Sequence, residues 1–325
     1  MDKQLSIIVP VFNVERYIYK CVESLFCQGL SDDFFEVIIV NDGTKDNSMD
    51  TITNIVSQHI NVRIINQQNQ GLSMARNNGL AHAVGRYVMF VDSDDFLIDN
   101  SLSVLLTKAL DSSVDLLIAD FVKMTDKDIE KFSAVIPSQS IQSTMLYGKD
   151  AFLYCLKPDQ CYVWRVLYRR GFLEENHLHF ISGLYFEDIP FTVECYLKTE
   201  KTLFYPIPLY VYRQHSDSIV STINKNKVID FNRVIAYVFA FQKSMCLSKG
   251  EKNKLSDIAF STFSIEIWYL IHEKGVYDFR REVVKDLKER VPGLFFGNGI
   301  KQYLTSIIFK WMPYSYLKIR YLLGM

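Results

Sequence analysis

The first half of the chain alternates short apolar runs with stretches in which apolar residues recur every three or four positions. Apolar runs bounded by turn residues are typical of strands buried on both faces, and the longer spacing is typical of amphipathic helices. Helices are predicted around Ile18–Leu25, around Ile52–Val56 and over Ser73–Val84, where Gly85 ends the last one. This alternation predicts a mostly parallel sheet with helices on both faces. The predicted strands are 5–11, 35–40, 62–65, 86–91 and 115–121.

Polar side chains follow the ends of three predicted strands. Asn13 and Glu15 come after the first, Asp42 after the second, and Asp92 and Asp94 after the fourth. In parallel sheets, ligands bind beyond the carboxyl ends of the strands. The sequence has no G-x-G-x-x-G after the first strand and no G-x-x-x-x-G-K-[ST], so neither phosphate loop is supported. The acceptor groups suit the donors of a base, ribose hydroxyls and a metal.

The acidic run Asp92, Asp94 and Asp95 is the first candidate site. Carboxylates crowded at the end of a buried strand repel one another, which favours a divalent cation or a ligand rich in hydroxyls and phosphates. Arg76 could meet part of a phosphate's charge. The alternative is an acidic loop that caps the helix beginning near Ser101.

A second acidic pair, Glu187 and Asp188, lies among apolar neighbours. Such surroundings raise the pKa of a carboxyl group and favour a general base. The alternative is a helix N-cap, because Pro190 suits the first turn of a helix.

The chain between these sites and beyond them is less regular. Residues 126–145 form an irregular connection, and Leu203–Arg213, with Pro206 and Pro208, is predicted to be an edge strand or extended connection. His215 and the following Ser216–Asp217–Ser218 fall in a predicted loop. His215 is either a metal or pyrophosphate contact or an ordinary surface or packing residue.

The chain beyond Lys225 has helical spacing throughout. Three helices are predicted within 231–245, 258–270 and 281–291. The last segment, Lys301–Met325, carries basic and aromatic residues and no acidic one. It suits an interfacial segment on an anionic membrane, or a helix docked on this domain or on a second subunit. Pro313 would break any single long helix there.

Composition limits the classes of function. Lys and Arg total 36 against 37 Asp and Glu in 325 residues, so no overall field attracts nucleic acid. Six cysteines without C-x-x-C spacing predict reduced, mostly buried thiols in a cytoplasmic protein. The N-terminal residues lack the features of a signal peptide, and no apolar stretch of about 18 residues predicts a transmembrane helix. The length predicts one large domain or two moderate ones.

Five segments, in this order and spacing, resemble the inverting family 2 glycosyltransferases. The resemblance covers about Leu5 to Ser221 and implies a GT-A-type α/β fold, a Rossmann-like nucleotide-binding sheet, with a helical C-terminal extension. It implies a catalytic domain at 1–222 and a helical region at 223–325. The segments are Val9–Asn13, Val40–Thr44, Gly71–Asn77, Asp92–Asp95 and Phe186–Asp188.

The resemblance also implies a set of nucleotide and donor contacts. Glu15 and Asp42, with the backbone at Pro10 and Phe12, would surround the nucleobase and ribose. Asp92 would lie near the ribose or donor sugar, and the arginine and asparagine of the third segment near the base and diphosphate. The full set is Pro10, Phe12, Asn13, Glu15, Asp42, Arg76, Asn77, Asp92 and Ser93.

Metal, base and acceptor residues are implied in the same way. Asp94 would bind Mg²⁺ or Mn²⁺ that bridges the diphosphate, and His215 would approach the same metal. Asp188 would be the general base, and Glu187 would hold the acceptor or orient the base. Trp164 resembles an aromatic acceptor-side position, where a ring face suits the apolar face of a sugar.

One position departs from the pattern. Many relatives have lysine where this chain has Val166, so Arg165 or Arg169 compensates or acceptor recognition differs. The implied activity is transfer of a hexosyl or N-acetylhexosaminyl group, from a UDP-sugar in first place, to a saccharide or lipid-linked acceptor. The implied setting is bacterial-type surface polysaccharide, O-antigen or glycolipid synthesis, in the cytoplasm or peripherally on the inner face of a membrane. The alternatives are a non-catalytic sugar-nucleotide-binding or scaffold protein and a nucleotidyltransferase.

Overall fold

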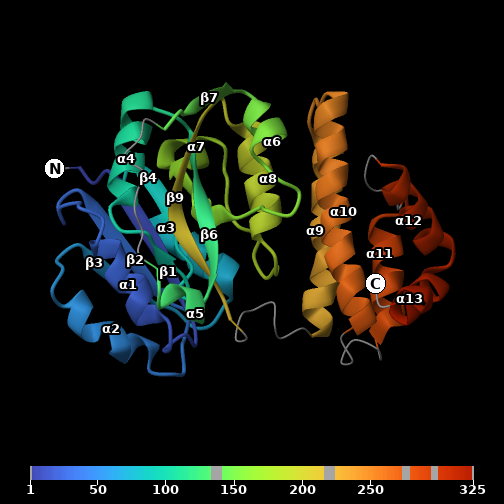
Figure 1. The fold of residues 1–325 in the computed structure, drawn as a ribbon, viewed down its shortest axis with the longest axis horizontal. Coiled ribbons are helices and arrows are strands. Elements are labelled where there is room, and N and C mark those ends of the chain that lie inside the picture. Colours follow the sequence, from blue (N-terminus) through green and yellow to red (C-terminus); the bar gives the residue numbers. More distant parts are fainter. Residues whose placement is uncertain (1, 133–140, 216–223, 273–278, 294–298, 324–325) are drawn as a thin grey trace. The chain divides into compact units, whose positions relative to one another are not determined.

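The computed structural model describes residues 2–132, 141–215, 224–272, 279–293 and 299–323. The chain divides into two compact units (Figure 1). The sheet unit comprises Met1–Ala151, Tyr162–Gly183 and Leu197–His215. The helical unit comprises Phe152–Cys161, Leu184–Tyr196 and Ser216–Met325. The boundary expected at residue 222 lies outside the described residues.

The sheet unit is built on nine strands among the described residues, in the order β3-β2-β1-β4-β8-β6-β9-β5, with β7 on β9. β3, β2, β1 and β4 are parallel, as the alternating pattern predicted. Beyond β4 the sheet is mixed, because β8 runs antiparallel between β4 and β6. The strands are β1 (Leu5–Val11), β2 (Phe35–Asn41), β3 (Val62–Asn66), β4 (Tyr87–Phe90), β5 (Phe96–Leu97), β6 (Leu116–Thr125), β7 (Thr144–Tyr147), β8 (Val166–Arg169) and β9 (Lys201–Gln214).

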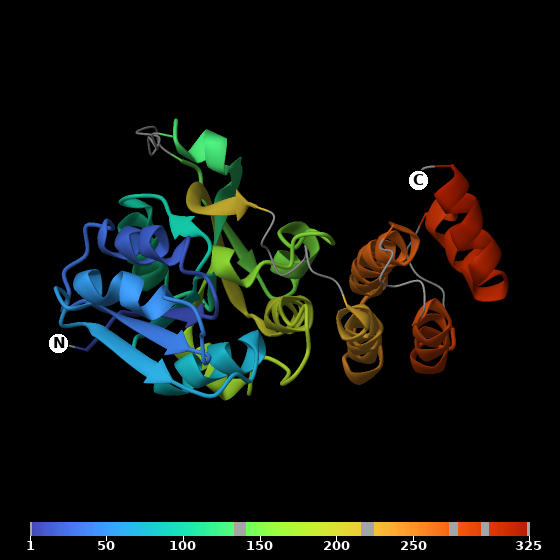
Figure 2. The ribbon, with the colours of Figure 1, turned by 90° about the horizontal axis from the view of Figure 1, so that it is seen from below.

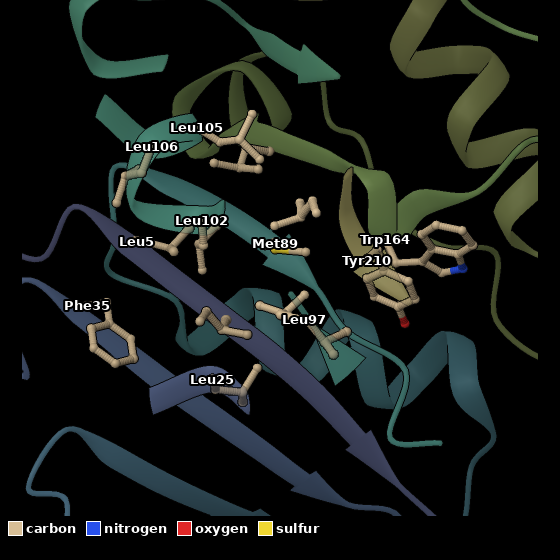
Figure 3. Close-up of a cluster of buried hydrophobic side chains, with 14 of the residues drawn as sticks. Leu5, Leu25, Phe35, Met89, Leu97, Leu102, Leu105, Leu106, Trp164 and Tyr210 are labelled. Atoms are coloured by element: carbon tan, nitrogen blue, oxygen red, sulfur yellow. The ribbon is translucent and has the colours of Figure 1, made fainter. Parts of the chain in front are cut away.

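Helices cover both faces of this sheet, as predicted. Successive residues of a strand point to opposite faces, so Leu5, Ile7 and Val9 share one core with α1, α2 and α4 (Figure 3). On the other face, Ile8 meets α3 at Gly79, where any Cβ would collide with the isoleucine side chain. The helices are α1 (Ile18–Phe26), α2 (Ser48–Val56), α3 (Leu72–His82), α4 (Ser101–Ser112), α5 (Asp126–Ile129) and α7 (Arg170–Glu175), and α6 (Asp150–Tyr154) and α8 (Asp188–Lys198) pass from one unit into the other.

β9 is not an edge strand, which corrects the sequence-based expectation. It pairs with β6 on one side and with β7 and β5 on the other. Proline cannot donate a ladder hydrogen bond, but β7 pairs with 201–204 and β5 with 210–211, so Pro206 and Pro208 lie between the two partners. The register against β6 also shifts beside Pro208.

The helical unit confirms the three predicted helices and the break at Pro313. α9 packs against α10 and α11, and α13 packs against α10 and α12 (Figure 2). No helix among the described residues is long and apolar enough to cross a membrane. The helices are α9 (Lys225–Ser244), α10 (Lys249–His272), α11 (Arg280–Arg290), α12 (Ile300–Trp311) and α13 (Pro313–Leu322).

The cysteines only partly follow the prediction. Cys21, Cys161 and Cys195 are buried, whereas Cys27 and Cys246 are exposed, so about half rather than most are covered. Burial raises the pKa of the Cys21 thiol, and the nearby carboxylates add to the shift.

Candidate active site

The parallel strands end at one edge of the sheet, which brings the predicted polar residues together. β1 and β2 pair in register up to Val11 and Asn41, and Ile8 of β1 pairs with Phe90 at the end of β4. The loops after these three strands therefore leave the sheet side by side. We call this the carboxyl-end edge.

The loops after β1 and β2 are joined by hydrogen bonds. The backbone N–H of Asn13 donates to Thr44 Oγ1 at 2.7 Å, and Asn13 Oδ1 accepts from the Lys45 N–H at 3.0 Å. Asn13 has a left-handed φ of 52°, which asparagine tolerates better than most residues. Glu15 Oε2 accepts from the Asn47 N–H at 2.8 Å. Both predicted side chains therefore tie the loop after β1 to the loop after β2.

Asp46 is a member of this loop pair that sequence reasoning missed. Its carboxylate accepts from the Glu15 N–H at 2.9 Å and from Thr44 Oγ1 at 2.7 Å. It also accepts from the Ser48 hydroxyl at 2.5 Å. Burial alone would raise the pKa of Asp46, but these hydrogen bonds outweigh it and lower the pKa. An aspartate two residues before the first residue of α2 was the available signal.

Asp42 is buried and organises the entry to α3. Its two oxygens accept from Gln67 Nε2 at 2.8 Å and from the backbone N–H groups of Gln70 at 2.8 Å and Gly71 at 2.9 Å. Phe12, which follows β1 at the same edge, keeps 41% of its surface exposed, whereas Pro10 is buried within β1.

Arg76 and Asp92 form an ion pair with a 2.6 Å Nη2–Oδ1 distance, in which the arginine is buried and the aspartate partly exposed. The Arg76 guanidinium also lies over the Phe180 ring, 5.2 Å from its centroid. Asn77 exchanges two hydrogen bonds with the Phe180 backbone, at 2.8 and 2.9 Å. Asn77 thus holds the ring on which Arg76 lies. Burial raises the pKa of Asp92, the Arg76 charge opposes this shift, and the Asp94 charge adds to it.

Asp94 and His215 are brought together although 121 positions separate them. Asp94 Oδ2 lies 3.1 Å from His215 Nε2. The His215 ring lies against Tyr17, with centroids 4.3 Å apart, and Arg213 Nε donates to the Asp94 carbonyl at 3.0 Å. Residues 216–218, the predicted loop cluster after His215, lie outside the described residues.

The donor set at Asp94 suits a hard divalent cation. No group of three or more His, Cys, Asp and Glu side chains in the described part of the chain is arranged to hold a metal. Mg²⁺, however, usually binds through one or two carboxylates together with substrate phosphates and water. Asp94 supplies one carboxylate of that kind, so this residue fits the group, and the His215 imidazole lies 3.1 Å from it.

Asp95 is tied to β9. It accepts from the Arg213 backbone N–H at 2.7 Å and from the Tyr210 hydroxyl. Burial raises the pKa of Asp95 well above its usual value, and the charges of Asp94 and Asp92 raise it further. Ser93, between these acids, is buried.

Trp164 has both ring faces covered. Tyr162 stacks on one face at 4.7 Å and Tyr210 on the other at 4.1 Å, each within 11° of parallel. A sugar therefore cannot stack on this indole face as the resemblance implied, and a contact would use the ring edge. The Tyr210 hydroxyl accepts from the Asp92 N–H at 3.1 Å, which links the stack to the acidic loop.

Arg165 and Arg169, the two residues that could replace the missing lysine, lie in different surroundings. Arg169 pairs in register with Tyr87, the first residue of β4, and so lies at the edge opposite Asp92. Arg165 is buried, and donates to the Ala119 carbonyl at 2.9 Å and to Asp120 at 3.3 Å. Of the two, Arg165 is therefore the one on the side of the carboxyl-end edge, and its guanidinium is already bonded within the sheet unit.

The second acidic pair belongs to the helical unit. Glu187, the residue before α8, is buried, and Asp188, the first residue of α8, is half-buried. The predicted helix with Pro190 in its first turn is therefore confirmed. Phe186 before them has a left-handed φ of 60°, which is strained for a bulky residue. Its ring stacks on Phe231 at 4.0 Å, and the Tyr185 N–H donates to Asp230 at 2.9 Å. Packing within this unit holds the acidic pair in place.

A mixed, mostly parallel sheet flanked by helices, with its polar residues gathered beyond the parallel strand ends, defines an α/β domain of the GT-A type. The family described as Glycosyl transferase family 2 matches residues 6–175. The chain belongs to this family.

Relatives and solved structures agree with this family. EpsJ of Bacillus subtilis, a glycosyltransferase, is 34% identical over 221 residues, which are 66% of this chain and 62% of EpsJ. YibD of Escherichia coli, also a glycosyltransferase, is 32% identical over 235 residues, 71% of this chain and 67% of YibD. The chain thus spans less than two thirds of the length of EpsJ.

The crystal structure of residues 1–349 of S. aureus TarS in complex with UDP-GlcNAc superposes with a TM-score of 0.73. It covers 99% of this chain and 92% of that one, at 18% identity. At this identity the likeness shows the fold.

Proposed function

We propose that the protein transfers a sugar from a nucleoside-diphosphate sugar, a UDP-sugar in first place, to an acceptor hydroxyl with inversion. The observation that carries the proposal is the pair of acids at the carboxyl-end edge. Asp92 and Asp94 are held there from two different elements, by Arg76 of α3 and His215 after β9. The complex of TarS with UDP-GlcNAc supports the choice of a UDP-sugar.

Donor binding would use the loops of the carboxyl-end edge. The exposed Phe12 and the backbone at Pro10, with Asn13, Glu15 and Asp42, would form the nucleoside side. Arg76, supported by Asn77 through Phe180, would face the diphosphate, with Asp92 and Ser93 beside the ribose or sugar. Arg76 and Asp92 are already paired, and the Asp42 carboxylate is fixed by three hydrogen bonds, so these side chains require little reorganisation on binding.

Asp94 and His215 would hold Mn²⁺ or Mg²⁺. When bound, this ion supplies Lewis-acid stabilisation of the charge on the departing nucleoside diphosphate. The chain's own contribution is to fix the two donors, through the Tyr17 ring beside His215 and the Arg213 side chain on the Asp94 carbonyl.

Asp188 would act as the general base. Its carboxylate would take the proton of the acceptor hydroxyl while that oxygen forms a bond to the anomeric carbon. The oxygen attacks from the side opposite the diphosphate, whose bond to this carbon breaks with its electron pair on the leaving oxygen, so the configuration at the carbon inverts. Glu187 would orient the base or acceptor, and Trp164 would contribute through its edge. The acceptor would be a saccharide or lipid-linked glycan of a bacterial-type surface polymer or glycolipid, reached from the cytoplasm.

The substitution Asp188→Asn tests the proposal. We expect acceptor-dependent UDP release to fall at least about 10³-fold, while titration calorimetry with UDP and Mn²⁺ gives an unchanged affinity. Asp159→Asn, an exposed acid of the same unit, is the matched control and should retain full turnover. Unchanged turnover in Asp188→Asn would remove this residue from catalysis. Tight donor binding without UDP release for any acceptor in the wild-type protein would identify a binding protein instead.

A further inference from the structure

Helix α12 is apolar on two opposite sides, and only one of them is packed. On the packed side, Phe309 is fully buried and meets the Phe263 ring of α10 edge-on, with centroids 5.0 Å apart. Ser306 is buried on the same side. The other side carries large apolar residues that are 39% to 82% exposed.

These exposed residues form one stripe. At about 100° per residue, they occupy the sector of the helix opposite Phe309. Ile300 is 82% exposed and Trp311 is 74% exposed, although monomeric proteins seldom leave such residues together on one face. We call this set the outer stripe. Its members are Ile300, Tyr303, Leu304, Ile308 and Trp311.

Lysines border the outer stripe on both sides. By the same helical geometry, Lys301 falls next to Ile308 at one border and Lys310 falls next to Tyr303 at the other. The sequence has no aspartate or glutamate from Val291 to the end, while Lys318 and Arg320 add two further cations. The surface is therefore apolar at its centre and positive at its rim.

This charge pattern decides between partners. Two copies meeting face to face would bring their lysine borders together without acids to neutralise them, which is unfavourable. An anionic bilayer surface fits both features. Apolar and aromatic side chains insert at the boundary of headgroups and acyl chains, and lysines at the border extend to the phosphates.

We propose that α12 docks on an anionic phospholipid surface, with the outer stripe inserted and the helix lying in the plane of the interface. The contact is peripheral, since no described helix is long and apolar enough to span a bilayer. The proposal rests on no part of the catalytic assignment, because all of its residues lie on α12 or in the segment after it, which carry no residue of the predicted site.

Vesicle sedimentation of the full chain tests the proposal. We expect binding to phosphatidylcholine vesicles that contain about 30% phosphatidylglycerol, weaker binding to pure phosphatidylcholine, and loss of binding at high salt. Leu304→Glu should lower the partition coefficient about tenfold or more, and the double variant Lys301→Glu/Lys310→Glu should remove the preference for anionic lipid. Ile60→Glu in the sheet unit, at a position that is 89% exposed, is the matched control and should bind as the wild type does.

A second measurement uses the tryptophan fluorescence of the wild-type protein itself. Trp311 is the most exposed of the three tryptophans, so brominated lipid should quench wild-type fluorescence more than that of Trp311→Phe. Absence of quenching, or equal partitioning of Leu304→Glu and the wild type, would overturn the proposal. So would a wild-type dimer that Leu304→Glu dissociates while vesicles bind neither protein, because a second copy would then cover the stripe.

Discussion

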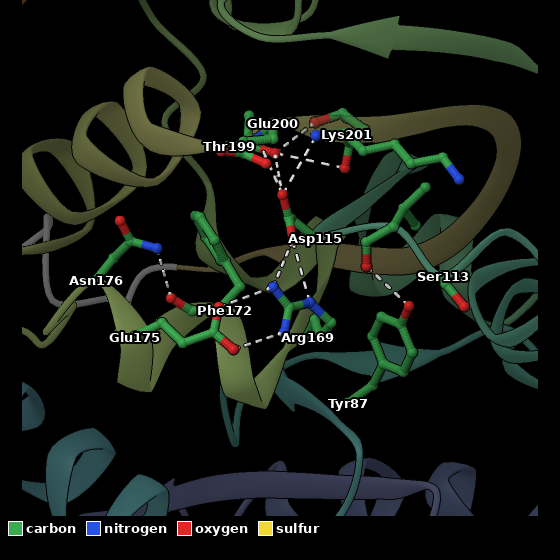
Figure 4. Close-up of polar contacts among 12 residues, drawn as sticks. Tyr87, Ser113, Asp115, Arg169, Phe172, Glu175, Asn176, Thr199, Glu200 and Lys201 are labelled. Carbon is green, nitrogen blue, oxygen red and sulfur yellow. Dashed lines mark hydrogen bonds and ion pairs between the residues drawn. The ribbon is translucent and has the colours of Figure 1, made fainter.

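The two edges of the sheet hold their buried carboxylates in opposite ways. At the edge where β4 begins, Asp115 is buried and surrounded by donors (Figure 4). Its Oδ1 accepts from Arg169 Nε at 3.1 Å and Nη2 at 2.9 Å. Its Oδ2 accepts from the backbone N–H groups of Glu200 at 2.9 Å and Lys201 at 3.2 Å. The negative charge of Asp115 is therefore balanced by the Arg169 guanidinium and by two backbone N–H dipoles.

At the carboxyl-end edge, three carboxylates stand within four positions. Arg76 pairs with Asp92, a histidine faces Asp94, and Asp95 relies on a backbone N–H and a tyrosine hydroxyl. The pKa values of Asp92 and Asp95 are raised by burial and by the neighbouring carboxylates. This edge therefore concentrates negative charge that the chain itself only partly neutralises.

The difference predicts opposite effects on stability for the acids at the two edges. A carboxylate that receives hydrogen bonds and a cation from its own chain stabilises the fold. Several carboxylates close together destabilise the fold by repulsion until a ligand or ion neutralises their charge. Acids at the two edges should accordingly respond differently to the same substitution of aspartate by asparagine.

The largest expected effect is on activity at the crowded edge. Asp94→Asn should lower kcat/KM for sugar transfer about 10³-fold, which corresponds to about 4 kcal/mol, by removing the proposed metal ligand. Urea unfolding should show no loss of stability, because one of three mutually repelling charges is gone. Asp99→Asn, an exposed acid nearby, serves as the control for both assays. A stability loss in Asp94→Asn as large as that at the opposite edge would break the comparison.

The next effect is on stability at the edge that holds Asp115. Asp115→Asn should lower the free energy of unfolding by about 3 kcal/mol, because it leaves Arg169 and backbone donors without their anion. Transfer by the folded fraction should stay unchanged. Glu175→Gln, which alters a largely exposed partner of Arg169, should cost less than about 1 kcal/mol. If both variants had the same small effect, Asp115 would not hold this edge together.

The smallest effect is a change in pH dependence at Asp95. A carboxyl group with a raised pKa binds its proton more tightly in the folded state, so stability falls as pH rises from the usual value of 3.8 through the raised one. Asp95→Asn should remove this contribution. The difference in unfolding free energy between the variant and the wild type should grow in favour of the variant as pH rises through that window. Below the window the two proteins should be equally stable. Thermal unfolding at a series of pH values measures this difference. A relative stability that declines with rising pH would mean that Asp95 is held as a favourable anion.

Much of the site's position followed from local pattern. A buried apolar run followed by a polar group identifies the end of a strand, and parallel strand ends meet at one edge, so Asp42, Asp92 and Asp94 could be placed together without coordinates. The same logic found the helices of the second unit and the break at Pro313.

The partners of these residues could not be found in this way. His215 lies 121 positions from Asp94, and Asn77 lies 103 from Phe180. The resemblance implied that the Trp164 ring face contacts the acceptor sugar. In the folded chain, Tyr162 and Tyr210 stack on that ring. The spacing of apolar residues along the chain does not indicate which distant side chains come into contact.

The sequence by itself thus determined the order of elements, the family resemblance and the edge that carries the acids, because hydrophobic periodicity and strand ends are local properties of the chain. Only the tertiary structure decided that β9 lies inside the sheet, that Arg169 lies at the far edge and that Asn77 bonds to the Phe180 backbone. These outcomes depend on strand register and on packing between distant segments, which a local pattern does not specify.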